Sequence, residues 1–137
     1  MDVNGEILKR IQLLFSNFTP KVLANNPCAV EPEQVVDLIK EKQEFVILDI
    51  RTPLEQELLA PRLENTLYIP MHELFKEENL KKIPKDKTVL VLCHTDRRAT
   101  AVVVALRLLG FDRTFVLRGG VVELSRVVGK ELYNRLF

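Results

Sequence analysis

Short apolar runs separated by polar stretches dominate the pattern of hydrophobic and polar positions along the chain. Residues 45–48 are Phe-Val-Ile-Leu, residues 88–92 are Thr-Val-Leu-Val-Leu, and residues 113–117 end in Phe-Val-Leu. A continuous apolar run of this length, in place of an alternating one, indicates a strand that is buried on both faces of a parallel sheet. A shorter strand is expected at residues 67–69, where Pro70 closes it.

Helical spacing of apolar residues predicts helices between these strands. They are expected at residues 32–42, 53–59, 72–80, 99–109 and 121–137, the last as one or two helices. The segment 99–109 is apolar almost all round, so periodicity fits a strand as well. Its length, its leucines and alanines, and Gly110 after it favour a buried helix. Strands that alternate with helices indicate an α/β fold with a mostly parallel sheet.

The first part of the chain carries an amphipathic pattern of its own. Within residues 6–18, the apolar positions at helical spacing are Ile7, Leu8, Ile11, Leu14, Phe15 and Phe18, and Lys9, Arg10 and Gln12 lie on another face. We expect this helix to cover part of the core; a homodimer contact and attachment to a membrane surface are the alternatives. Prolines and asparagines then break the pattern. Residues 1–30 are therefore an N-terminal helix with a connecting segment, and residues 31–137 are the main domain.

Composition and charge narrow the classes of function. The chain has 137 residues, of which 47% are hydrophobic and 28% charged, and its formal net charge is +1. This length suits one domain, and the near-neutral charge argues against nucleic-acid binding. No apolar stretch is long enough for a transmembrane span, and the first residues lack the pattern of a signal peptide, so we expect a cytoplasmic protein.

Cys93 is the strongest candidate for chemistry. The two cysteines, Cys28 and Cys93, and the two histidines, His72 and His94, lack metal-ligand spacing, so no metal site is predicted. Cys93 ends the strand at 88–92, and before the next helix come His94, Thr95, Asp96, Arg97 and Arg98. A strand that feeds a helix through so tight a curve points its N–H groups inward and forms an anion nest.

Such surroundings lower the pKa of a cysteine from ~8.5 to roughly 3.5–7.5, and the thiolate is the nucleophile. We therefore predict a reactive thiolate at Cys93, with an ordinary packed core thiol as the alternative. The carboxyl ends of parallel strands meet at one edge of a sheet. Asp49 and Arg51, which follow the strand at 45–48, are thus expected to share a crevice with Cys93.

Four motifs together resemble one known family. Residues 48–55, Leu-Asp-Ile-Arg-Thr-Pro-Leu-Glu, resemble the D-x-R-x-x-x-E signature of rhodanese-like domains, and Cys93 to Arg98 resemble their six-residue C-x-x-x-x-R active-site loop. Residues 109–111, Leu-Gly-Phe, and residues 117–120, Leu-Arg-Gly-Gly, are similar to the family's L-G-F and L-x-G-G segments. Found in this order over residues 32–126, they make the resemblance specific.

The resemblance implies a three-layer α/β/α domain with a central, mostly parallel five-stranded sheet and sulfurtransferase activity. Cys93 would take sulfane sulfur from thiosulfate, a persulfide or a polysulfide, hold it as a persulfide, and pass it to cyanide or a thiol. No metal or organic cofactor is implied, and a sulfur-carrier protein is a further candidate partner. His94 to Arg98 would surround the sulfur, Asp49 would tie down the loop, and Arg51 and Glu55 would be structural or ion-pairing groups near it.

The chain also departs from the family pattern. Residues 59–64, Leu-Ala-Pro-Arg-Leu-Glu, stand where the family has G-H-I-x-G-A, and Leu124 stands where many members carry tryptophan. Asp96 stands where the family has a glycine, and it brings a carboxylate near Cys93. If this position requires a positive φ, aspartate is less favourable there than glycine. His94 is either a substrate contact or proton donor, or a solvent-facing loop residue.

Two rival functions remain open from the sequence. A cysteine phosphatase or arsenate reductase uses a similar thiolate nest, but phosphatase loops place five residues between cysteine and arginine, whereas four separate Cys93 from Arg98. A non-catalytic protein-binding or regulatory module is the second rival, because a fold does not dictate function. The retained Cys93 favours the enzyme over the module.

Overall fold

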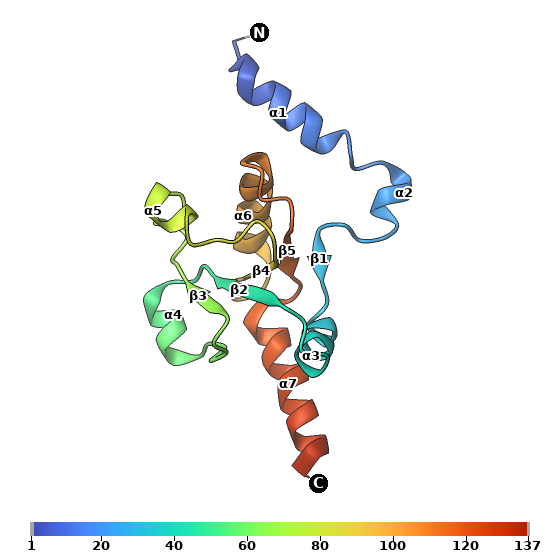
Figure 1. Ribbon diagram of the computed structural model, residues 1–137, viewed down its shortest axis with the longest axis vertical. Coiled ribbons are helices and arrows are strands. Elements are labelled where there is room, and N and C mark those ends of the chain that lie inside the picture. Colours follow the sequence, from blue (N-terminus) through green and yellow to red (C-terminus); the bar gives the residue numbers. More distant parts are fainter. Residues whose placement is uncertain (1, 137) are drawn as a thin grey trace.

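A single parallel sheet forms the centre of the molecule (Figure 1). The computed structural model describes the backbone of residues 2–136 and the side chains of residues 2–130. Within this part of the chain the strands are β1 (Ala29–Val30), β2 (Phe45–Asp49), β3 (Thr66–Tyr68), β4 (Thr88–Leu92) and β5 (Thr114–Leu117). Their order is β1-β5-β4-β2-β3, and every neighbouring pair is parallel. The predicted α/β fold with a central five-stranded sheet is confirmed.

Helices connect the strands. They are α1 (Gly5–Phe15), α2 (Pro20–Leu23), α3 (Pro32–Lys40), α4 (Pro53–Leu58), α5 (Glu77–Leu80), α6 (Arg97–Leu108) and α7 (Gly120–Leu136). The segment at 99–109 is indeed a helix, and it begins two residues earlier than expected, at Arg97. The C-terminal segment is one helix, and the predicted end at Phe137 lies outside the described residues.

Three elements differ from the sequence-based expectations. The strand β1 and the helix α2 lie within residues 20–30, which the sequence indicates only as a connection. A helix is expected over residues 72–80, but only Glu77–Leu80 is helical. The preceding residues form turns, in which the Glu73 N–H donates to the carbonyl of Pro70 and the Lys76 N–H to the carbonyl of Glu73.

The alternating side chains of β4 explain its continuous apolar run. Val89, Val91 and Cys93 belong to the core that α6 covers, whereas Leu90 and Leu92 belong to the core under α3 and α7. This alternation is a property of any strand. Figure 1 shows α6 on one side of the sheet and α3 and α7 on the other. The strand is therefore buried on both faces, and Cys93 follows it on the α6 side.

The helix α1 does not cover the core, so that expectation is wrong. None of its residues is buried, and the side chains of Ile7, Leu13 and Phe15 are 52%, 72% and 53% exposed. It contacts α6 from outside and lies away from the sheet (Figure 1). Among residues 2–136 no helix combines the length and the apolar character that crossing a bilayer requires.

Candidate active site

The loop after Cys93 rests on the N-terminus of α7. The Val121 N–H donates to the carbonyl of Cys93 at 3.0 Å, and the Val122 N–H donates to the carbonyl of His94 at 3.4 Å. A Cβ at Gly120 would lie 2.2–2.5 Å from the carbonyl oxygens of Cys93, His94 and Thr95, and its φ is +59°. Only glycine fits such a close approach in this conformation. The paired glycines therefore let α7 hold the loop by its carbonyls.

This arrangement turns the loop's N–H groups the opposite way. In a trans peptide the C=O and the N–H point in opposite directions, and the described chain contains no cis peptide. The N–H groups of His94, Thr95 and Asp96 therefore point away from α7. They and the amides of Arg97 and Arg98, in the first turn of α6, donate to no acceptor within residues 2–136. These five N–H groups are therefore free to donate to a ligand, and the nest around the Cys93 sulfur stays a prediction.

The loop side chains differ in exposure. Cys93 is 1% exposed, while His94, Thr95 and Arg97 are exposed and Asp96 and Arg98 are half-buried. Asp96 is the N-cap of α6 with φ −155°, so it needs no left-handed conformation, and its side chain makes no capping hydrogen bond. Its carbonyl accepts hydrogen bonds from the Thr100 N–H and hydroxyl. Aspartate therefore replaces the family's glycine without the positive φ that the sequence raises as a concern.

Glu55 joins α4 to this loop. It forms a capping box with Thr52: the Glu55 N–H donates to Thr52 Oγ1, and the Thr52 N–H donates to Glu55 Oε1. The same carboxylate accepts two hydrogen bonds from Arg98, at 2.9 Å to Oε1 and 2.8 Å to Oε2. Both oxygens are thus engaged, and the planar fork of Arg98 is held in one orientation.

The Glu55–Arg98 pair is strongly coupled. The hydrogen bonds from Arg98, with a smaller contribution from Thr52, lower the pKa of Glu55 from 4.5 to about 2. The hydrogen bonds to Glu55 raise the pKa of Arg98, and the charge of the same carboxylate and the proximity of Cys93 and Asp49 raise it further. Arg98 is consequently a permanent cation within electrostatic reach of Cys93.

Asp49 does not tie down the loop, contrary to the role expected from the resemblance. Its carboxylate accepts hydrogen bonds from the Arg51 side chain at 3.0 Å (Nε) and 2.8 Å (Nη2), and from the Arg51 N–H at 3.1 Å. Arg51 also donates to the carbonyls of Glu55 and Leu59, at the end of α4. The pair therefore anchors α4 to the end of β2, and Glu55 is the residue that reaches the loop.

Gln56 is a supporting residue that the sequence does not indicate. Its Nε2 donates to the carbonyls of Asp49 at 3.2 Å and Arg51 at 3.0 Å, where β2 turns into α4. Gly120 belongs to the paired-glycine motif, but its contact with the loop appears only in three dimensions. The paired-glycine motif was the signal for Gly120, whereas no motif position marks Gln56.

Residues 59–63, which depart from the family pattern, pack next to α7. They form one wall of an apolar hollow of about 300 Å³ against α3 and α7, and Leu124 lines it too. The Arg62 guanidinium donates to the carbonyl of Gln56 at 3.2 Å, and the Tyr68 hydroxyl donates to the carbonyl of Pro61. The altered segment is therefore held against the domain on the side of the sheet that α3 and α7 cover.

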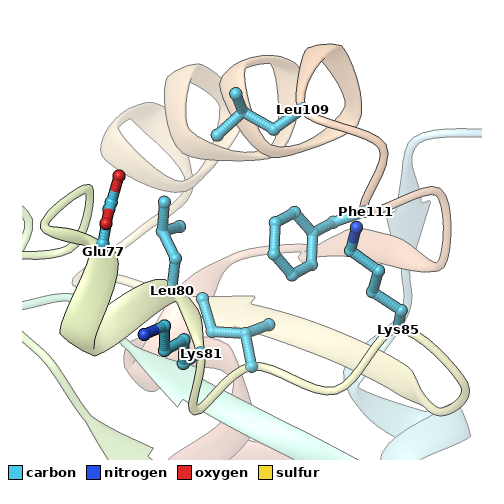
Figure 2. A pocket seen from close by; sticks show the side chains of 7 residues that line it. Glu77, Leu80, Lys81, Lys85, Leu109 and Phe111 are labelled. Atoms are coloured by element: carbon cyan, nitrogen blue, oxygen red, sulfur yellow. The ribbon is translucent and has the colours of Figure 1, made fainter.

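A second hollow lies between α5 and the C-terminal end of α6 (Figure 2). It measures about 460 Å³, and its lining consists of Glu77, Leu80, Lys81, Ile83, Lys85, Leu109 and Phe111. The Lys85 ammonium lies 4.9 Å from the centre of the Phe111 ring, which Figure 2 shows at the edge of the hollow. None of the predicted site residues lines it, so it is separate from the Cys93 site.

The two cysteines lie far apart. The carbonyl of Cys28, just before β1, accepts a hydrogen bond from the Val116 N–H on β5 at 2.8 Å. Because β5 lies between β1 and β4, Cys28 and Cys93 are separated by about 10 Å across the sheet. This exceeds the Cα separation of about 7 Å that a disulfide spans. Both cysteines are free thiols, and Cys93 alone belongs to the site.

Cys93 thus lies at the carboxyl edge of a parallel sheet, at the start of a loop that α7 holds and beside an arginine that Glu55 fixes. Residues 31–126 match the family described as the rhodanese-like domain, and the chain belongs to that family. It is 25% identical to a rhodanese-related protein of known structure from Thermoplasma volcanium, with a TM-score of 0.62, over 72% of this chain and 91% of that one. The resemblance inferred from the motifs is confirmed.

Two curated relatives carry sulfurtransferase in their names. A sulfurtransferase of Allochromatium vinosum is 27% identical over 97 residues, which are 71% of this chain and 87% of that protein. A probable adenylyltransferase/sulfurtransferase, MoeZ, of Mycobacterium tuberculosis is 26% identical over 97 residues, which are 71% of this chain and 24% of that protein. This chain thus spans about a quarter of the length of the second relative.

Proposed function

We propose that this protein is a sulfurtransferase that carries sulfane sulfur as a persulfide on Cys93. The observation that carries the proposal is the set of five N–H groups from His94 to Arg98 that find no acceptor within residues 2–136, in the loop that follows a cysteine 1% exposed; we infer that they form a nest around its sulfur. Such a nest stabilises a sulfur anion at the end of a side chain. The family match and the names of the two relatives support the same activity.

The first half-reaction loads the sulfur. The Cys93 thiolate attacks the outer sulfur of thiosulfate; a new S–S bond forms to Cys93, the S–S bond of the donor breaks, and sulfite leaves with the bonding electron pair. The terminal sulfur of the resulting persulfide carries the negative charge. The N–H groups of the loop donate to it, and Arg98, held by Glu55, supplies positive charge nearby.

The second half-reaction unloads it. A thiophilic acceptor such as cyanide attacks the terminal sulfur; an S–C bond forms, the S–S bond breaks, and the electron pair returns to Cys93 as a thiolate. With a thiolate acceptor the product is a new persulfide on that thiol. The loop serves both half-reactions. Its N–H groups stabilise the negative charge on the terminal sulfur of the persulfide, and then the charge that returns to the Cys93 sulfur.

Intact mass spectrometry tests the proposal directly. The purified protein is treated briefly with thiosulfate or a polysulfide, alongside Cys93→Ser and, as the matched control, Cys28→Ser. We expect a gain of one sulfur atom in the wild type and in Cys28→Ser, its removal by cyanide, and no gain in Cys93→Ser. Folded, reduced protein that gains no sulfur from either donor would instead support a non-catalytic binding module.

A further inference from the structure

The apolar hollow between α3, α7 and residues 59–63 has a buried floor and an exposed rim. Val35 on α3 and Val121 and Leu124 on α7 form the floor and are at most 7% exposed. The rim consists of aliphatic side chains that are between 37% and 53% exposed, namely Ile39, Leu59, Leu63 and Val128. Because all of them line one depression, they form a continuous apolar surface, and such surfaces on soluble domains mark binding sites.

The polar side chains at this hollow are few and carry one uncompensated charge. In its described lining, Arg62 is the one charged residue and Ser125 the one hydroxyl. The Arg62 guanidinium donates once, to the carbonyl of Gln56, and forms no ion pair within residues 2–130. A guanidinium has five N–H donors. Most donors of Arg62 are therefore available at the rim, where the described lining holds no competing carboxylate.

The backbone of the wall adds further donors. The N–H groups of Ala60, Arg62 and Leu63 donate to no acceptor within residues 2–136, whereas Pro61 has no N–H. In contrast, the carbonyls of Leu59, Pro61 and Leu63 already accept hydrogen bonds. The free hydrogen-bonding groups of this wall are thus mainly donors. With the charge of Arg62, they suit an anionic acceptor better than a donor.

We propose that this hollow binds a small monocarboxylate with an aliphatic body, of the size of a medium-chain fatty acid. The chain lies on the apolar floor, and the carboxylate pairs with Arg62 at the rim. Guanidinium and carboxylate match in a bidentate geometry, which fixes the orientation of the ligand. The described lining contains no aromatic ring on which a planar ligand could stack, so an aliphatic body is favoured.

The volume of the hollow favours a small molecule over a protein partner. It measures about 300 Å³, at the lower end of the roughly 300–1,000 Å³ that is typical of small-molecule pockets. An apolar cavity of about 150 Å³ is large enough to hold a benzene molecule. A specific protein interface, in contrast, buries roughly 800 Å² on each partner. The lining also follows the usual composition of a ligand pocket, with apolar walls and a few polar groups that orient the ligand.

The proposed ligand site is separate from the Cys93 site. None of the residues from Cys93 to Arg98 lines the hollow, and the hollow lies on the side of the sheet that α3 and α7 cover. Binding of a carboxylate is therefore measurable without sulfur transfer. The inference goes beyond the proposed sulfurtransferase activity, and each can fail while the other holds.

Isothermal titration calorimetry of the full chain with octanoate and with 1-octanol tests the ligand class. We expect one octanoate to bind per chain, at least about tenfold more tightly than octanol, because octanol lacks the charge that pairs with Arg62. Absence of octanoate binding overturns the proposal. Equal affinity for the two ligands overturns the carboxylate as the recognised group.

Two variants of α7 test whether the ligand lies in this hollow. Val128→Glu places a carboxylate in the rim and should lower the affinity for octanoate at least about tenfold. Val122→Glu is the matched control, because Val122 has a similar exposure on the same helix, 45% against 42%, and does not line the hollow. Both positions are exposed, so the fold is kept, and circular dichroism checks this. Equal binding by the two variants overturns the location.

Arg62→Gln tests the contact with the carboxylate. It should lower the affinity for octanoate about tenfold and leave the affinity for octanol unchanged, since octanol binds through its chain alone. Lys81→Gln, which removes a cation from the hollow beside α5, is the control and should not change octanoate binding. An effect of Lys81→Gln that equals the effect of Arg62→Gln contradicts the proposed contact.

Amide resonances locate the ligand without any substitution. In a titration followed by ¹⁵N–¹H correlation spectra, the signals of Ala60, Arg62 and Leu63 should shift as octanoate is added. Leu109 and Phe111 line the hollow beside α5, so their signals should stay in place. Shifts confined to Leu109 and Phe111 would place the ligand in that other hollow and overturn the proposal.

Discussion

Two arginine–carboxylate pairs flank α4, and their surroundings differ. Asp49 and Arg51 are 0% and 2% exposed, whereas Glu55 and Arg98 are 30% and 36% exposed. Both pairs are bidentate and have a shortest contact of 2.8 Å. Both pairs join an arginine to a carboxylate in the same way, so their different burial accounts for their different roles. The first pair maintains the fold, and the second sets the position of a cation that solvent and ligands can still reach.

Desolvation explains this division. A buried pair has already lost its contacts with water, so removing one partner leaves the other charge uncompensated. Arg51 and Asp49 are in that position, and the carbonyls of Glu55 and Leu59 depend on the same guanidinium. In the exposed pair water replaces a missing partner, so the free energy of unfolding depends little on it. The two pairs should therefore respond differently to equivalent substitutions.

The largest effect is expected for Arg51→Met. It leaves the Asp49 carboxylate buried without its counter-charge and with only the residue-51 N–H as a donor, so the free energy of unfolding should fall by about 3–5 kcal/mol. Urea denaturation followed by circular dichroism measures this. Asp49→Asn/Arg51→Met, which removes both charges, should recover part of the loss. A loss below about 1 kcal/mol in the single variant would contradict the structural role of the pair.

Arg98→Met should act on activity. We expect kcat/KM for thiosulfate to fall about 10²-fold, the usual effect of deleting one preorganised charge donor. Arg98→Lys should keep part of the activity, because it retains the charge but loses the bidentate hydrogen bonding. Steady-state kinetics and urea denaturation on the same samples separate the effect on activity from the effect on stability. A stability loss equal to that of Arg51→Met would erase the distinction between the pairs.

Glu55→Gln should have a smaller effect on stability. The neutral amide still accepts one hydrogen bond from Arg98 but loses the ion pair, and partial exposure limits the cost to about 1 kcal/mol. The free energy of unfolding at neutral pH measures it. Leu54→Gln, one position away on α4 and 64% exposed, is the matched control and should leave stability unchanged.

The smallest effect is a dependence on pH. The pKa of Glu55 lies at about 2 in the folded protein, below its ordinary value of 4.5. Its ionised form therefore stabilises the fold fully above pH 4.5, and the contribution disappears as the pH falls through about 2. The stability difference between wild type and Glu55→Gln should be constant near neutral pH and shrink below pH 4.5. A difference that grows on acidification would contradict the pairing.

Much of the fold was predictable because continuous apolar runs signal buried parallel strands. β2 and β4 lie where the runs at 45–48 and 88–92 predict them. β1 is only two residues long, Ala29 and Val30, and carries no such signal. The α1 pattern predicts a helix correctly, but periodicity reveals an apolar face without revealing what covers it.

The contacts within the candidate site could not be predicted from the sequence. Sequence spacing brings Asp49 and Arg51 to the sheet edge beside Cys93, as the parallel topology requires. The partner of Arg98 is 43 positions away, and no local pattern decides whether Glu55 or Asp49 reaches it. Arg51 donates to both oxygens of the Asp49 carboxylate, so Glu55 is the carboxylate that pairs with Arg98. This choice of partners depends on the folded structure and not on the local sequence.

The enclosure of Cys93 reverses the usual order of thiol labelling. Cys28 is half-buried, whereas Cys93 is 1% exposed at the base of its loop. A chemoproteomic survey with a bulky maleimide would rank Cys28 as the reactive cysteine of this protein and pass over Cys93, the proposed nucleophile. A reagent the size of hydrogen peroxide or methyl methanethiosulfonate would give the opposite ranking. In this protein the cysteine that escapes a large probe is the one that marks the site.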